Sequence, residues 1–388
     1  MTTPRRIQDI QPFHVMALLA RAKELEAQGK DIVHMEIGEP DFPTPQPIVE
    51  AGMAAISSGD VHYTSAVGLP ELREAIAAFY LSHYGVKVSA NRIVITPGAS
   101  GALMLALGVI MQEGDEILMA DPGYPCNRNF VRFLSGKTRA IAVDASTGYQ
   151  LTLQHLQQNW NSKTVAALVA SPSNPTGTLI SKTELSEMAS FVKEKGGYLI
   201  VDEIYLGLVY DADVSTALKL DSKVDSCIIV INSFSKYFNM TGWRVGWIVA
   251  PDELIKDMDK LAQNIFLAAP TPAQYAALAA FKPETIKILE SHKEEFKQRR
   301  DYLLPALKQL GFKIETQPQG AFYIYANCEK FSADSYQFAY DLLENIGVAI
   351  TPGKDFGDNK ANTFVRFAYT TSISNLEKGM QRLSDYLA

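Results

Sequence analysis

The sequence predicts an α/β protein: a three-layer, mostly parallel sheet with helices on both faces, followed by a smaller α+β domain. From about residue 92, short apolar runs alternate with longer amphipathic segments, which is the pattern of strands joined by crossover helices. The apolar runs show little polar alternation, as expected for strands that are buried on both faces. After residue 270 the pattern changes to helix, and then to a mixture of strands and helices.

The composition and charge of the chain argue against several classes of protein. Of the 388 residues, 47% are hydrophobic and 20% charged, which is typical of a globular chain rather than a disordered one. The formal charge of −7 argues against a nucleic-acid binder. No apolar run has the ~18 residues of a membrane span, and we expect no secretory signal. Three widely separated cysteines predict reduced thiols in a cytoplasmic protein, and the histidine spacing gives no support for a metal site.

The N-terminal segment is expected to contain a helix. Its apolar residues recur with helical spacing at Val15, Leu18, Leu19, Ala22 and Leu25. A loop is expected over residues 38–47, because four prolines in this stretch forbid regular structure.

The central part of the chain contains the predicted strands of the large sheet. The apolar runs that indicate them are residues 93–96, 116–120, 165–170, 198–202 and 227–232. Helical segments between them include residues 101–111 and 182–195. Residues 242–250 are a further candidate strand. Because only about ten residues separate it from the preceding run, an antiparallel neighbour is favoured over a helical crossover.

The C-terminal part is predicted to form a second domain. After Pro270 the pattern is helical for about forty residues, and Pro283 suits the start of a long connecting helix. Strand candidates follow at residues 321–325, 348–351 and 364–368. We therefore expect a large domain over residues 48–285, and a small domain built from residues 1–47 and 286–388.

Polar residues follow four of the predicted strands at the point where each strand ends. These groups are residues 96–101, 171–177, 202–205 and 232–236. Alone, each has an ordinary interpretation as a turn, a helix cap or a solvated lysine. Because the carboxyl ends of parallel strands share one edge of a sheet, we expect the groups to converge on one crevice. The amides that open the helix after residue 98 are suited to a phosphate.

The motifs and their order resemble those of a known family. The most specific string is Ser233-Phe-Ser-Lys-Tyr-Phe-Asn-Met-Thr-Gly-Trp-Arg-Val-Gly. The other motifs are Gly38-Glu-Pro-Asp-Phe, His62-Tyr-Thr-Ser-Ala-Val-Gly, Gly98-Ala-Ser-Gly, Asp121-Pro-Gly-Tyr, Ser171-Pro-Ser-Asn-Pro-Thr-Gly, Asp202-Glu-Ile-Tyr and Phe364-Val-Arg-Phe. Over nearly the whole chain, this set resembles the fold-type-I, class I/II aspartate-aminotransferase-like enzymes, which use pyridoxal 5'-phosphate.

The resemblance implies roles for the residues around the cofactor ring. Lys236 is implied as the lysine that forms the Schiff base and later moves a proton from the substrate α-carbon. Asp202 is implied to pair with the pyridine nitrogen. Tyr205 and Asn174 are implied to donate to the ring hydroxyl oxygen, and Tyr124 to stack on the ring.

The resemblance also implies a phosphate site. Its members are the backbone amides of Ala99 and Ser100 and the side chains of Ser233, Ser235 and Arg244. Arg244 is also the cation expected, together with burial, to lower the pKa of the lysine.

Substrate binding and assembly follow from the same resemblance. Arg366 is implied to bind the substrate α-carboxylate, assisted by the Gly38 amide and the Asn174 side chain, with closure of the small domain on substrate. Tyr63 matches a tyrosine that reaches the phosphate from the partner subunit, which predicts a homodimer with shared sites. The alternative for Tyr63 is a local packing role.

The predicted function is amino transfer from an α-amino acid to a 2-oxo acid by a ping-pong mechanism. One alternative is β-elimination from a sulfur amino acid by a C–S lyase, which needs the same lysine, aspartate and arginine. A remote alternative is a sensor domain of a transcription regulator, for which the chain has no DNA-binding domain before residue 30. Aspartate, aromatic residues, alanine and methionine all stay open as amino donors, with aspartate favoured by the resemblance.

Overall fold

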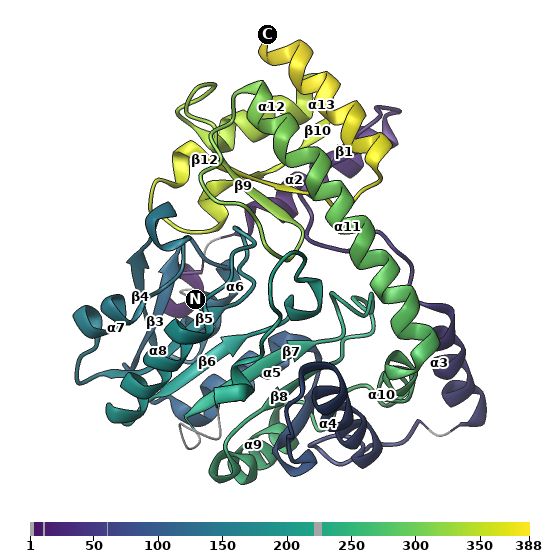
Figure 1. The fold of residues 1–388 in the computed structure, drawn as a ribbon, viewed down its shortest axis with the longest axis vertical. Helices are drawn as coiled ribbons and strands as arrows, with labels where there is room; N and C mark the ends of the chain where they lie inside the picture. Colours follow the sequence, from purple (N-terminus) through teal and green to yellow (C-terminus); the bar gives the residue numbers. More distant parts are fainter. Residues whose placement is uncertain (1–3, 11, 60, 221–226) are drawn as a thin grey trace.

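The computed structural model describes residues 4–10, 12–59, 61–220 and 227–388. Its largest sheet has seven strands in the order β2-β8-β7-β6-β5-β3-β4 (Figure 1). Their bounds are β2 Ile93–Thr96, β3 Glu116–Asp121, β4 Lys137–Ala142, β5 Thr164–Ala170, β6 Tyr198–Asp202, β7 Ile228–Ser233 and β8 Gly246–Val249. β8 is antiparallel to β7 and β2, and the other pairs are parallel. The predicted fold class and the antiparallel neighbour of β7 are confirmed.

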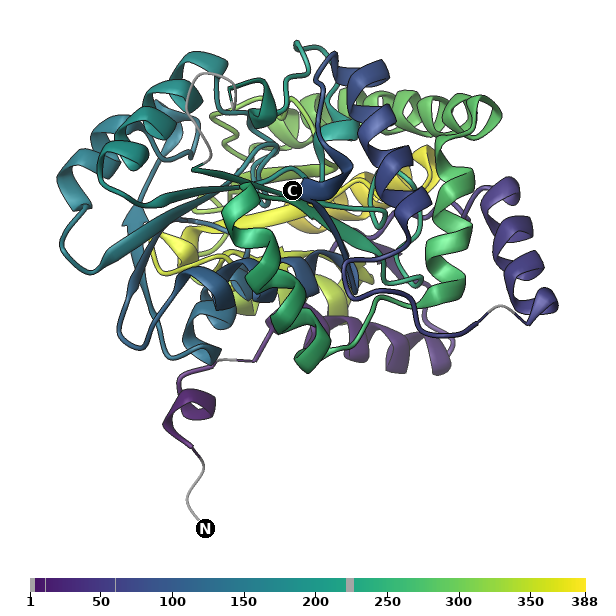
Figure 2. The same ribbon diagram turned by 90° about the horizontal axis from the view of Figure 1, so that it is seen from below.

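Helices cover both faces of this sheet. Figure 2 shows the sheet as a layer between them. In β6, Leu199 and Val201 belong to one hydrophobic core and Ile200 to the other, because successive side chains of a strand point to opposite faces. One face is covered by α5 (Gly98–Ile110), α6 (Pro125–Phe133) and α9 (Asp252–Ile265). The other is covered by α4 (Pro70–Tyr84), α7 (Leu153–Asn159), α8 (Lys182–Glu194) and α10 (Thr271–Leu278), and α3 (Gln46–Ser58) packs on α10.

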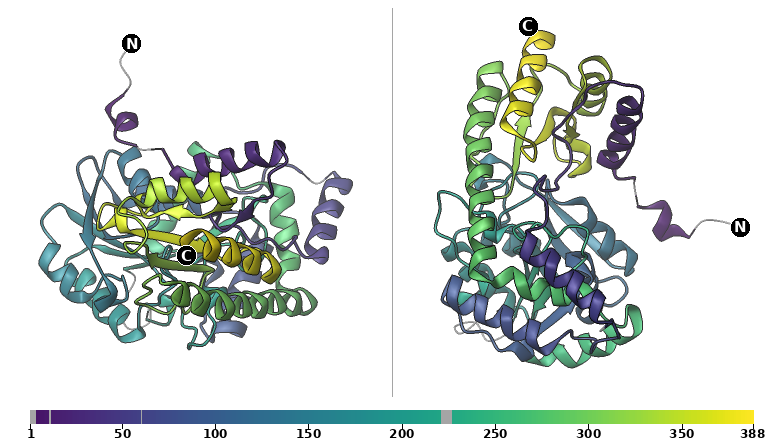
Figure 3. Two further views of the ribbon diagram at one scale, coloured as in Figure 1. Left: turned by 90° about the horizontal axis from the view of Figure 1, so that it is seen from above. Right: turned by 90° about the vertical axis from the view of Figure 1, so that its right-hand side faces the viewer.

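A smaller layer lies beyond the carboxyl edge of the large sheet. It contains the antiparallel sheet β11 (Thr351–Pro352), β12 (Phe364–Ala368) and β9 (Tyr323–Asn327), and the parallel pair β1 (Val33–His34) and β10 (Val348–Ala349). Chain segments from both ends therefore meet here. α2 (His14–Ala27) packs against α12 (Ser335–Ile346), which packs against α13 (Ile373–Leu387) (Figure 3). The short α1 (Arg5–Gln8) lies against α6.

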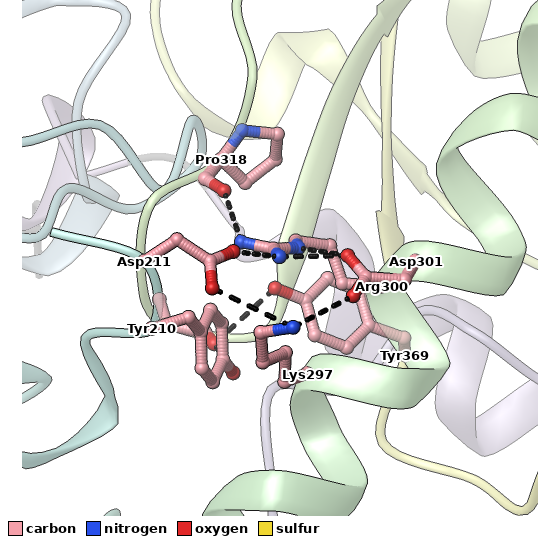
Figure 4. A network of polar contacts seen from close by, with 8 residues as sticks. Tyr210, Asp211, Lys297, Arg300, Asp301, Pro318 and Tyr369 are labelled. Atoms are coloured by element: carbon pink, nitrogen blue, oxygen red, sulfur yellow. Dashed lines mark hydrogen bonds and ion pairs between the residues drawn. The ribbon is translucent and has the colours of Figure 1, made fainter.

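The long helix α11 (Pro283–Leu310) runs along both layers and begins at Pro283, as predicted. It carries two buried arginines, and buried charges are stable only when they are paired. Arg299 binds both carboxylate oxygens of Asp41, at 2.7 and 3.0 Å. Arg300 donates to Asp211, to Asp301 and to the carbonyl of Pro318 (Figure 4). These bonds hold the loop after β6 and the loop before β9 against one helix.

Several predicted strand boundaries are corrected. Strand β4 was not predicted, because it is an edge strand that begins Lys137-Thr-Arg and exposes much of its surface. The predicted strand at 242–250 begins only at Gly246, since Arg244 has a left-handed backbone with φ 55°. The strand predicted from residue 321 begins at Tyr323, because Ala321 has φ 58°. The single run at 348–351 is divided between two sheets. Over the described residues, no helix combines the length and apolar character needed to cross a membrane.

Candidate active site

The carboxyl ends of β5, β6 and β7 open into one cavity of about 640 Å³. The small layer and the N-terminal segment complete its walls. The predicted site residues that line it are Gly38, Ala99, Ser100, Tyr124, Asn174, Asp202, Tyr205, Ser233, Ser235, Lys236, Arg244 and Arg366. The structure thus brings together residues that lie more than 300 positions apart in the chain. Tyr63 does not line the cavity; its side chain is 83% exposed.

Lys236 follows β7 and extends into the cavity. Its Nζ donates a hydrogen bond to the carbonyl of Gly38 at 2.7 Å. Burial lowers the pKa of Lys236 to about 8; Arg366 and Arg244 also lower it, whereas Glu39 and Asp202 raise it. At neutral pH a useful fraction of this amine is therefore unprotonated, which is the form that acts as a nucleophile or base.

Asp202 ends β6 and is buried beside the cavity. Its Oδ1 accepts a hydrogen bond from the amide of Ile204 at 3.1 Å. Burial raises the pKa of Asp202 to about 6, although the Ile204 amide and Lys236 both lower it. A buried carboxylate of this kind gains much from a cationic N–H partner, because its own desolvation is otherwise uncompensated.

The neighbouring Glu203 is buried within the fold and does not line the cavity. Its two oxygens accept from the Ala217 amide at 2.6 Å and the Thr216 hydroxyl at 2.8 Å. Burial raises the pKa of Glu203 from 4.5 to about 8; those two hydrogen bonds lower it and Asp202 raises it. The folded state therefore holds a proton that the unfolded state loses between these pH values, so this residue makes stability fall as pH rises through that window.

We expect Glu203→Gln to remove this pH dependence. Glutamine cannot titrate, and it can accept from Ala217 and donate to Thr216. The difference between the Tm of the variant and the Tm of the parent should therefore become more positive from pH 5 to pH 8, as measured by calorimetry. The exposed Glu194→Gln is the matched control and should show no such trend. A Tm difference for Glu203→Gln that is constant with pH would contradict the account.

A cradle suited to an anion lies where α5 begins. Ser235 Oγ accepts from Ser233 Oγ at 3.0 Å and is 3.5 Å from Arg244 Nη1. Gly98 has φ 69°, a left-handed backbone that favours glycine, and a Cβ there would lie 2.4 Å from Arg244 Nη2, so a larger residue would have to displace the guanidinium. A helix N-terminus and a guanidinium together favour a bound phosphate or carboxylate group.

Arg366 lies on β12 and reaches the cavity from the small layer. Nη1 donates to Asn174 Oδ1 at 2.9 Å, and Nη2 donates to the carbonyl of Glu36 at 2.5 Å. Its Nε is buried and has no hydrogen-bond partner among the described residues. The guanidinium stacks 4.2 Å from the ring centroid of Tyr323. An unsatisfied N–H of a buried cation is costly, and a bound carboxylate would satisfy it.

Several lining residues were not predicted. The hydroxyls of Tyr323 and Tyr205 form a hydrogen bond at 2.8 Å. A Cβ at Gly38 would lie 1.9 Å from the Tyr323 hydroxyl, so the close approach of residue 38 to this tyrosine needs glycine. Glu39 accepts from the Thr241 hydroxyl at the same cavity. These residues do not follow a strand of the large sheet. A search for polar residues at the ends of its strands therefore does not find them.

Comparison with known proteins identifies relatives over the full length. The family model described as aminotransferase class I and II matches residues 30–383. The chain is 40% identical over 383 residues to the (5-formylfuran-3-yl)methyl phosphate transaminase of Methanocaldococcus jannaschii, covering 99% of each. It is 33% identical over 383 residues to an aspartate aminotransferase of Thermotoga maritima, covering 99% of this chain and 98% of the relative. A solved aminotransferase from Mycobacterium tuberculosis superposes with a TM-score of 0.95 at 36% identity, covering 100% and 99% of the chains.

Proposed function

This chain belongs to the class I and II aminotransferases, and we propose that it moves amino groups through pyridoxal 5'-phosphate bound to Lys236 in a ping-pong cycle. The observation that carries the proposal is the convergence on one cavity of a lysine with lowered pKa, a buried carboxylate and an arginine whose Nε has no partner in the described part of the chain. Family members generally use this cofactor, and the residues present fit it.

The cradle at the start of α5 is proposed to hold the phosphate. The amides of Ala99 and Ser100 lie in the first turn of α5, where they lack partners within the helix. The hydroxyls of Ser233 and Ser235 and the guanidinium of Arg244 complete the site. Together they offer a dianion both a helix dipole and a full positive charge.

The residues around the ring are proposed to fix its orientation and its charge. Asp202 holds a proton on the pyridine nitrogen, which offsets the cost of burying its carboxylate. Tyr205 and Asn174 donate to the ring hydroxyl oxygen, and Tyr124 stacks on the ring face. When bound, the cofactor supplies an electron-withdrawing ring next to a reactive carbon.

Lys236 is proposed to have two roles. Its neutral Nζ would hold the cofactor aldehyde covalently with release of water, and the Nζ set free by the substrate amine would accept the proton of the substrate α-carbon. The pKa of about 8 supports both roles, because a lysine at its ordinary pKa of 10.5 would be almost fully protonated at neutral pH.

Arg366 is proposed to bind the substrate α-carboxylate, with help from the Gly38 amide and the Asn174 side chain. The arginine lies on the small layer and the cofactor residues on the large one, so carboxylate binding draws the two together. This arrangement supports a closure of the proposed small domain (residues 1–47 and 286–388) onto the large one (residues 48–285).

Tyr63 is proposed to complete the phosphate site of a second subunit. Its side chain is 83% exposed, and Met53, Ile56 and Val61 near it in sequence also expose apolar surface. Exposed apolar side chains gathered in one segment favour an interface. The proposed assembly is a homodimer of a cytoplasmic enzyme.

The proposed function is tested by following the products. Enzyme supplied with pyridoxal 5'-phosphate, an amino acid and 2-oxoglutarate should form glutamate and the new 2-oxo acid in equal amounts over many turnovers. When 2-oxoglutarate is left out, the new 2-oxo acid should not exceed one equivalent per active site. Release of ammonia and thiol from cysteine-type substrates without an acceptor would instead show β-elimination and overturn the proposal.

A further inference from the structure

One part of the cavity wall is apolar and consists of residues to which the proposed function gives no role. It consists of Phe13, Val15, Met16, Ile37, Leu103 and Phe130, which we call the apolar wall. Phe13 packs edge-to-face against Tyr124, with ring centroids 6.5 Å apart. Met16 is 52% exposed although it lines the cavity, so its flexible thioether is available to contact a bound molecule.

The apolar wall is fixed in place by a buried carboxylate. The two oxygens of Asp355 accept from the amides of His14 and Val15, each at 2.8 Å, and they satisfy the N-terminus of α2, whose N-cap residue Phe13 has no side-chain cap. Arg128 of α6 donates to the Asp355 carbonyl at 2.7 Å. The first turn of α2 is thus held between two other parts of the fold, and the apolar surface is built into the site.

The charges of the cavity leave this wall without a positive group. Among the described lining residues, the cations are Lys236, Arg244 and Arg366, and the proposed function uses all three for cofactor and α-carboxylate. Arg128 donates a hydrogen bond to the backbone carbonyl of Asp355 and does not line the cavity. The remaining charge at the cavity apart from Asp202 is Glu39, which is negative.

Resting on the proposed function, we infer that the preferred amino donor carries a large apolar side chain, above all an aromatic ring, that packs on the apolar wall. Burial of such a side chain against Phe13, Val15 and Met16 is favourable. A second carboxylate, as in aspartate, would lose its hydration there without gaining a cation. The inference therefore departs from the expectation of aspartate.

The test is a single half-reaction, which needs no acceptor. Enzyme loaded with pyridoxal 5'-phosphate is mixed with one amino acid, and the loss of visible absorbance is followed by stopped flow. Phenylalanine and tyrosine should react with a second-order rate constant at least about tenfold above that of aspartate. A rate constant for aspartate equal to or above that for phenylalanine overturns the inference about the donor and leaves the proposed function intact. If no amino acid changes the absorbance, the proposed function fails and the inference fails with it.

A charge placed on the apolar wall gives a second test. Met16→Lys keeps a long side chain at a half-exposed helical position. It should shift the ratio of the aspartate to the phenylalanine rate constant toward aspartate by about fivefold, the scale of one exposed ion pair. Leu81→Lys is the matched control, since Leu81 is 56% exposed on α4 and does not line the cavity; its ratio should equal the parent's. No shift in Met16→Lys, or an equal shift in both variants, contradicts the assignment.

Discussion

Replacing Lys236 with alanine should abolish the visible absorbance of the covalently held cofactor and lower multiple-turnover amino transfer by at least about 10²–10⁴-fold, the usual contribution of a positioned proton-transfer group. Among the described residues that line the cavity, the variant has no other amine to bind the aldehyde or to accept the α-proton. The phosphate cradle at α5 stays intact, so the variant should still bind pyridoxal 5'-phosphate reversibly, which equilibrium dialysis measures.

The matched control is Lys308→Ala, an exposed lysine in the last turn of α11. It should keep both the absorbance and the turnover of the parent. Multiple-turnover transamination in Lys236→Ala at more than a tenth of the parent rate would remove Lys236 from its assigned role.

The Arg366→Lys variant should lower kcat/KM for amino acids by about 10²–10⁴-fold, on the scale of two charge-assisted hydrogen bonds at ~1.5–3 kcal/mol each. Lysine keeps the charge but lacks the planar fork, so it cannot bind Asn174, the Glu36 carbonyl and a substrate carboxylate together. Steady-state kinetics measure the effect, and calorimetry reports how much of the fold's stability is lost.

A substrate without a carboxylate separates recognition from general damage. The slow reaction of an aralkylamine such as benzylamine should be nearly equal in the parent and in Arg366→Lys, and the absorbance of the bound cofactor should be unchanged. An equal loss of rate for the amine and for the amino acid would show that Arg366 acts on the fold and not on the carboxylate.

Much of the large sheet is predictable from sequence because its central strands are buried on both faces. β5, β6 and β7 are unbroken apolar runs, and the polar residue that ends each run lies at the shared edge. The sequence alone therefore predicts that Asp202 and Lys236 lie together. The order of the motifs also predicted the family, and the full-length relatives confirm it.

The parts that sequence could not predict depend on contacts between distant segments. The edge strand β4 has no continuous apolar run, and the boundaries of β8 and β9 depend on the left-handed backbone at Arg244 and Ala321. Tyr323 reaches the cavity because β9 pairs with β12, and the first turn of α2 reaches it because Asp355 caps α2. No local pattern near Phe13 or Tyr323 encodes these pairings.

The covalent link at Lys236 is tested most directly by reduction with borohydride followed by mass analysis of the digested protein. The account predicts that enzyme supplied with pyridoxal 5'-phosphate loses its visible absorbance on reduction, and that the peptide containing Lys236 gains the mass of one reduced pyridoxyl phosphate group. A protein that stays colourless with the cofactor, or that carries the added mass on a different lysine, would contradict it.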